Sequence, residues 1–226
     1  MNLRAQLFAV ALMALALGAS ASLAAAATPE GDPASGKFPV PGTATSGESV
    51  LSLASGVTLT CTSGTGSGQA TSKTTGEGNY ILHGCKESTF NSACTTAGQP
   101  AGTIKLETLT LHLVYLDHNK KPGVLATPPA SGVFAKLTCF GGLVTIEVKG
   151  NGVLGEITSP KCGGTSKTGT VVTEATSHGT QKYRQVEGTG TFYDMSVSLN
   201  GGSFETAATT WLVNGTSIES STLTCP

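Results

Sequence analysis

The chain has 226 residues, 12% of which are charged, and its 13 Lys and Arg nearly balance its 14 Asp and Glu. Phosphate backbones are bound chiefly by clustered Lys and Arg, and the sequence has no run of like charge, so the composition argues against a nucleic-acid partner. The length is sufficient for one large domain or two small ones with a buried core.

Residues 1–27 predict a signal peptide. Arg4 supplies a positive start, residues 7–17 form a short apolar run, and residues 24–27 offer small side chains for cleavage before Thr28. No later segment approaches the ~20 apolar residues that a membrane-spanning helix needs. We therefore expect an exported protein, secreted or associated with the cell envelope, that does not span a membrane.

Residues 28–47 are rich in Pro, Gly, Ala and Ser, a composition typical of a spacer or a loosely attached arm. Its four prolines are expected to interrupt any regular element: Pro29, Pro33, Pro39 and Pro41. We place a single β domain after this spacer, at residues 48–226.

Short apolar alternations separated by Gly, Ser, Thr and Asn fill residues 48–226, which predicts antiparallel strands. Residues 57–61, 133–139 and 193–199 each place apolar side chains on one face. In the run 103–117 the apolar positions change from even to odd, which predicts a bulge near Glu107 or Thr108. Glycine pairs at 141–142 and 201–202 predict hairpin turns. The expected fold is an all-β antiparallel sandwich or barrel.

Gly64-Thr65-Gly66-Ser67-Gly68 is the most glycine-rich string in this region. It is out of register with the G-x-S-x-G of a nucleophile elbow, and it lacks the third glycine of G-x-G-x-x-G. We interpret residues 64–68 as a loop, with no catalytic, phosphate-binding or cofactor-binding role.

Histidines and carboxylates do not form a recognisable site. His112 and His118 would lie about 20 Å apart on one strand and so could not share a metal there. Pairing with His83 or His178 across the sheet stays open, although each of the four is expected to be a surface or hydrogen-bonded structural residue. Glycosidases use two carboxylates about 5–10 Å apart, but nothing selects a pair among the seven candidates, which are Glu107, Glu147, Glu156, Glu174, Glu187, Asp194 and Glu205.

Two further expectations concern single side chains. Lys136, Glu147 and Lys149 are expected to make cross-strand charge contacts, and Trp211, the only tryptophan, is expected in the core.

The cysteines predict a disulfide-stapled fold, because an even number in an exported chain usually pairs. Spacing alone selects one bridge, Cys85 with Cys94. The pairs lack the C-x2-C or C-x4-C spacing of common zinc sites, so no metal is expected. The six are Cys61, Cys85, Cys94, Cys139, Cys162 and Cys225.

Several local motifs over residues 55–200 resemble a group of uncharacterised secreted, β-rich, cysteine-containing proteins of soil actinobacteria. The motifs are the strand ending at Cys61, the 84–94 loop followed by 101–104, the segment 134–139, and Gly150 with 153–160. The resemblance implies export and a β fold, but no activity. Cys162 and Cys225 depart from the group's pattern, which implies an extra bridge between them and leaves Cys61 for Cys139.

The function expected from these observations is binding or structural packing, at the cell surface or in the medium, by a protein that is not an enzyme. Its partner would be an extracellular ligand or an envelope component. Two alternatives stay open. One is a secreted hydrolase of polysaccharide or peptide, and the other is a protease inhibitor that presents the Cys85 to Cys94 loop.

Overall fold

The computed structural model describes residues 28–116, 120–177 and 179–226, which form an antiparallel β structure with three disulfides. The all-β, disulfide-stapled fold expected from the sequence is confirmed. Within the described ranges, no helix has the length and apolar character needed to cross a bilayer.

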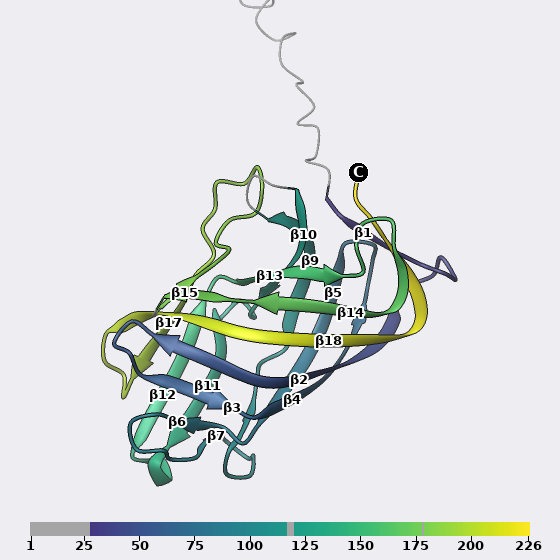
Figure 1. Ribbon diagram of the computed structural model, residues 1–226. Coiled ribbons are helices and arrows are strands. Elements are labelled where there is room, and N and C mark those ends of the chain that lie inside the picture. The colour runs from purple at the N-terminus through teal and green to yellow at the C-terminus, as the bar shows by residue number, and fades with distance from the viewer. Residues whose placement is uncertain (1–27, 117–119, 178) are drawn as a thin grey trace, which may run out of the picture.

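Eight strands close into a barrel (Figure 1). In spatial order they are β2 (Val40–Leu53), β4 (Ser63–Ala70), β5 (Thr75–His83), β9 (Leu109–Leu116), β10 (Lys121–Thr127), β13 (Val153–Ser159), β14 (Thr165–Thr173) and β18 (Phe204–Thr224). Strand β18 pairs with β14 on one side and with β2 on the other, through pairs such as Gly215 with Gly169 and with Ala44. This double pairing closes the ring.

A second sheet region extends from one end of the barrel, at the lower left of Figure 1. The first residues of β18 pair with β17, which continues to β12, β11 and β7, while β3 and β6 extend from β2. These strands are β17 (Met195–Leu199), β12 (Val144–Gly150), β11 (Val133–Cys139), β7 (Cys94–Thr96), β3 (Thr58–Cys61) and β6 (Lys86–Glu87). The main apolar core lies here and includes Leu59, Ile104, Leu137, Val148 and Val197.

Shorter elements complete the chain. Strand β1 (Glu30–Pro33) pairs with the end of β18, and β8 (Thr103–Lys105) pairs with β5. Strands β15 (Ala175–Ser177) and β16 (Thr180–Gln181) form a small separate hairpin. A 3-10 turn covers Phe140–Gly142. That turn joins β11 to β12, so the hairpin expected around Gly141–Gly142 is present, and Asn200–Gly202 lies in the turn between β17 and β18.

The spacer predicted at residues 28–47 is wrong, because this segment forms β1 and the first half of β2. Its prolines fit the strands. Pro41 precedes Gly42, the first β2 residue that pairs with β18, and proline is tolerated where a strand begins. The β structure therefore starts well before residue 48.

The bulge predicted near Glu107 or Thr108 is confirmed. Strand β5 pairs Ile81 with Lys105 and Gly78 with Leu109, a change of one residue in register. The three residues 106–108 therefore face only two on β5, and the backbone N–H of Leu106 donates to the Tyr80 carbonyl across the bulge.

Candidate ligand cavity inside the barrel

Alternate side chains of the barrel strands point inward and surround a cavity of about 590 Å³. On β18, residues 211, 213, 215 and 217 are half-buried, whereas 212, 214, 216 and 218 are exposed. The inward set of this strand is Trp211, Val213, Gly215 and Ser217, and all four line the cavity. Their partial exposure arises because they face an internal space.

Glycine forms one wall of this space. Strand β4 directs Gly64, Gly66 and Gly68 inward, and β5 directs Gly76 and Gly78. An eight-stranded barrel is just wide enough for its inward side chains to fill it. Gly78 leaves room inside, since an added Cβ would have its nearest neighbour at 3.5 Å, whereas a Cβ on the other four would meet the Tyr80 ring or the neighbouring strand. The expectation of a loop at residues 64–68 is therefore wrong, since the string is strand β4; Gly66 and Gly68 line the lumen, and Gly64 lies against the Tyr80 ring.

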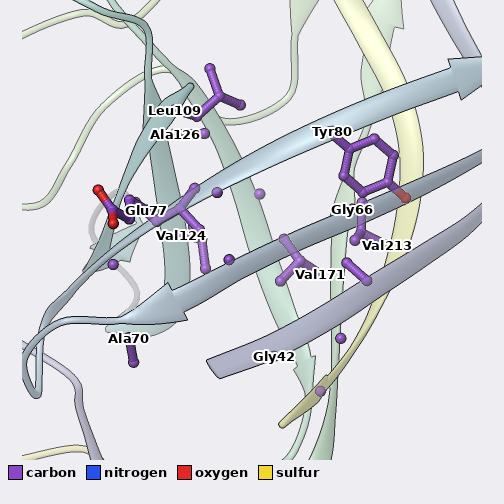
Figure 2. A pocket seen from close by; sticks show the side chains of 18 of the residues that line it. Gly42, Gly66, Ala70, Glu77, Tyr80, Leu109, Val124, Ala126, Val171 and Val213 are labelled. Carbon is purple, nitrogen blue, oxygen red and sulfur yellow. The ribbon is translucent and has the colours of Figure 1, made fainter. Parts of the chain in front are cut away.

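Aliphatic side chains form the wall on other strands of the barrel. Figure 2 shows Val124, Val171 and Val213, from three different strands, around the same space. Leu111 and Leu113 of β9 add to this wall. The lumen between the two walls is apolar along most of its length.

An aromatic pair lies where the barrel meets the second sheet region. The rings of Tyr80 and Trp211 meet edge to face with centroids 4.6 Å apart. The Tyr80 ring also covers Gly64 and Gly66, because a Cβ on either glycine would lie 2.4 Å from a ring atom. Trp211, expected in the core, is thus part of the cavity wall.

The polar tips of this pair are enclosed. Tyr80 Oη, Trp211 Nε1 and the nearby Ser46 Oγ are buried and have no hydrogen-bond partner among the described residues. Burial raises the pKa of the Tyr80 hydroxyl, and the neighbouring Ser46 hydroxyl opposes this with a smaller effect.

The cavity holds no pair of converging acids. Among the described residues that line it, Glu77 is the one carboxylate, and its exposed side chain points away from the lumen to accept a hydrogen bond from Gln69 Nε2 at 2.8 Å (Figure 2). Two carboxylates flanking a reacting bond, as hydrolysis of glycosides requires, are thus not present in the described lining.

The carboxylates considered from the sequence are engaged elsewhere. Glu147 binds both Lys136 and Lys149, which confirms the expected cross-strand contacts. The others make separate contacts: Glu156 with Lys121 and Tyr183, Glu174 with Lys182, Asp194 with Arg184, Glu187 with the Lys120 backbone and Glu205 with Ser55, while Glu107 lies in the bulge.

The histidines do not gather either. His83 ends β5 near Thr65 and His112 lies on β9, whereas His118 and His178 are outside the described residues. In the part of the chain that the structure describes, no group of three metal-ligating side chains occurs.

All six cysteines form disulfides, but two of the three expected pairings are wrong. The bridges are Cys61 with Cys85, Cys94 with Cys139, and Cys162 with Cys225. Only the last was expected. Cys94 lies directly opposite Cys139 in the β7–β11 register, and Cys61 with Cys85 continues the β3–β6 pairing by one step. Tertiary strand pairing, not closeness in sequence, therefore selects the partners.

The Cys85 to Cys94 loop is organised without a bridge across its own ends. The Glu87 carboxylate, 7% exposed, accepts hydrogen bonds from the backbone N–H groups of Thr89, Phe90 and Ser92. Burial alone would raise the pKa of Glu87, but these donors together lower it below its ordinary value. The inhibitor hypothesis rested on a bridged loop, and that bridge is not there.

Polar side chains gather at the end of the cavity away from the second sheet region. We call Ser72, Thr74, Ser166, Thr168, Ser221 and Thr222 the outer rim; all six line the cavity. Lys73 lies beside them and binds Asp32 at 2.7 Å and Glu30 at 3.3 Å. Hydrogen bonds to both carboxylates raise the pKa of Lys73.

The chain matches no protein-family model, and comparison with curated proteins and with solved structures finds no similar protein. The chemistry of the cavity is therefore argued from its own residues. A lumen of glycine and aliphatic side chains with a polar rim can enclose an apolar molecule by the hydrophobic effect.

Proposed function

We propose that this protein is an exported, non-catalytic binding protein that holds an apolar small molecule inside its barrel. The observation that carries the proposal is the cavity of about 590 Å³ with its glycine and aliphatic walls. Its volume falls within the roughly 300–1,000 Å³ that ligand pockets occupy, and such pockets are mostly apolar.

The choice of glycine supports a lumen kept open for a ligand. Glycine in a strand interior weakens the strand, since it loses more conformational entropy on folding and has no side chain to pack. Larger side chains would fit at some of these positions, because a Cβ on Gly215 would have its nearest neighbour at 3.9 Å and one on Gly78 at 3.5 Å. Glycine at these two positions therefore leaves the lumen open instead of filling it with a packed side chain.

We infer the oxidising compartment of the protein from its disulfides. Three bridges indicate an oxidising environment. The export signal predicted at residues 1–27 and the resemblance to secreted proteins support release to the medium or the envelope.

The proposal is tested by filling the lumen. Leucine in place of Gly78 or Gly215 would occupy space that a ligand needs, whereas Gly47→Leu is a matched control, because Gly47 is exposed and nothing lies within 4 Å of its added Cβ. N-phenyl-1-naphthylamine, an uncharged dye that brightens in apolar surroundings, is titrated into each protein.

We expect saturable binding at one site per chain in the native protein and in Gly47→Leu. The two lumen variants should bind at least about tenfold more weakly, since displacing two buried methylenes removes roughly 1.6 kcal/mol. Equal affinity in all four proteins would show that the dye binds outside the barrel, and no saturable binding at all would overturn the proposal.

A further inference from the structure

The polarity of the cavity changes from one end to the other. Its inner end reaches the core of the second sheet region, where Leu59, Leu137 and Met195 line it. The outer rim at the other end is made of hydroxyl residues, among which Ser166 and Ser221 lie directly opposite each other on β14 and β18. An occupant matched to this lining is apolar over most of its length and polar at one end.

The cavity is also long. On β2 the lining runs from Val40 to Leu51, and at about 3.3 Å per residue, with strands tilted by about 40°, this corresponds to roughly 25 Å along the barrel axis. A lumen of this length and apolar lining can hold one extended hydrocarbon chain along the barrel axis.

The outer rim lies where the barrel wall is interrupted. Strand β14 pairs Ser166 with Ser221 and then Thr168 with Thr216, so one residue of β14 faces four of β18. Of these four residues, Ser217 faces inward and its hydroxyl donates to the Lys167 carbonyl, while Glu219 accepts hydrogen bonds from the backbone N–H and the hydroxyl of Ser35. The bulge lies beside Ser166 and Ser221 at the end of the barrel, where a headgroup can contact water.

The charges at this end favour an uncharged headgroup. Lys73 is bonded to Asp32 and Glu30, so its positive charge is already balanced by two carboxylates. The six rim side chains are neutral and offer hydroxyl donors and acceptors. Lys167 also lines this end, but its side chain is exposed to solvent, so a carboxylate headgroup would meet mainly neutral hydroxyls and the Glu30–Asp32 pair, whereas a hydroxylated headgroup can hydrogen-bond to the rim.

We propose that the barrel binds a single-chain neutral amphiphile, with one linear acyl chain along the lumen and a hydroxyl-bearing headgroup at the outer rim, as in a monoacylglycerol. This inference rests on the proposed function and names the ligand class of the same cavity. Binding involves no covalent step.

The test is competition against bound N-phenyl-1-naphthylamine with monoacylglycerols from octanoyl to stearoyl, each below its critical micelle concentration. Every methylene that enters the lumen contributes about 0.8 kcal/mol, so we expect the affinity to rise about fourfold per methylene until the chain fills the lumen. The free fatty acid of the same length, at a pH where it is ionised, should compete at least about tenfold more weakly.

Rim variants locate the headgroup. Ser166→Ala combined with Ser221→Ala should weaken the monoacylglycerol several-fold and leave dye binding unchanged, while Gly47→Leu should alter neither. Dye binding without any dependence on acyl length, or a fatty acid that binds more tightly than the matched monoacylglycerol, would overturn the amphiphile inference and leave the proposed function standing. Absence of saturable dye binding would remove both.

Discussion

The disulfide map can be tested by removing cysteines in pairs. Cys61, Cys85, Cys94 and Cys139 belong to one buried cluster, and the Cys94 backbone N–H donates to the Cys85 carbonyl. The structure bridges Cys61 to Cys85 and Cys94 to Cys139, with sequence separations of 24 and 45. In the chain-entropy account these loops contribute about 3.5 and about 4 kcal/mol at 25 °C.

The expected losses follow from which bridges each double variant breaks. Cys61→Ala with Cys85→Ala should lower the free energy of unfolding by about 3.5 kcal/mol, and Cys94→Ala with Cys139→Ala by about 4 kcal/mol. Cys85→Ala with Cys94→Ala breaks both bridges, so it should lose about 7 kcal/mol, comparable with the whole stability of many domains.

Two assays read the outcome. Denaturant unfolding is followed by the fluorescence of Trp211, the single tryptophan, and the native bridges are mapped by mass spectrometry after tryptic digestion without reduction. Each of the four cysteines lies on its own tryptic peptide, at residues 38–73, 74–86, 87–105 and 137–149. We expect 38–73 linked to 74–86 and 87–105 linked to 137–149. Two results together would refute the strand pairing of β3 with β6 and of β7 with β11. The first is a disulfide link between peptides 74–86 and 87–105. The second is that Cys85→Ala with Cys94→Ala loses the least free energy of unfolding of the three double variants.

Two further predictions concern buried polar groups. Glu87→Gln should destabilise the protein by about 1–2 kcal/mol at neutral pH, since the carboxylate accepts three backbone N–H bonds. Because folding lowers the pKa of Glu87, its contribution is present above the unfolded value near 4.5 and is lost as the pH falls through the folded value. The difference between native protein and variant in urea unfolding should therefore shrink in acid, and a difference that does not change between pH 7 and pH 3 would contradict this. Tyr80→Phe should raise the free energy of unfolding by about 1 kcal/mol, because it removes a buried hydroxyl without a partner and keeps the ring contact with Trp211; a loss of stability in the same unfolding assay would show that the hydroxyl is hydrogen-bonded after all.

Local patterns in the sequence predict local structure well. Alternation of apolar residues predicts the strands, and the change of phase in residues 103–117 locates the bulge between β8 and β9. Closure is a different matter, because it depends on β2 pairing with β18 across most of the chain. Neither strand carries a local mark of that partner, so a sandwich and a barrel were equally compatible with the sequence.

The cavity was missed for a related reason. Glycine is depleted in strands, so Gly64-Thr65-Gly66-Ser67-Gly68 was interpreted as a loop, although its period of two was the available signal. Once β4 is paired on both sides, that period places every glycine on the inward face. The spacer was misassigned in the same way, since proline content was weighed against strand formation without knowledge of the register.

The pairing of β2 with β18 also determines when the barrel can form. Strand β2 is among the first strands to leave the ribosome, and β18 follows every other strand in the chain. Until β18 is available, β2 and β14 each lack it as a neighbour, and the apolar interior of the barrel is open to water and to other chains. Such distant partners make folding slow and leave an intermediate prone to aggregation. Cys162 and Cys225 join the loop before β14 to the segment after β18, so formation of that bridge marks the moment at which closure is complete and can serve as its kinetic reporter.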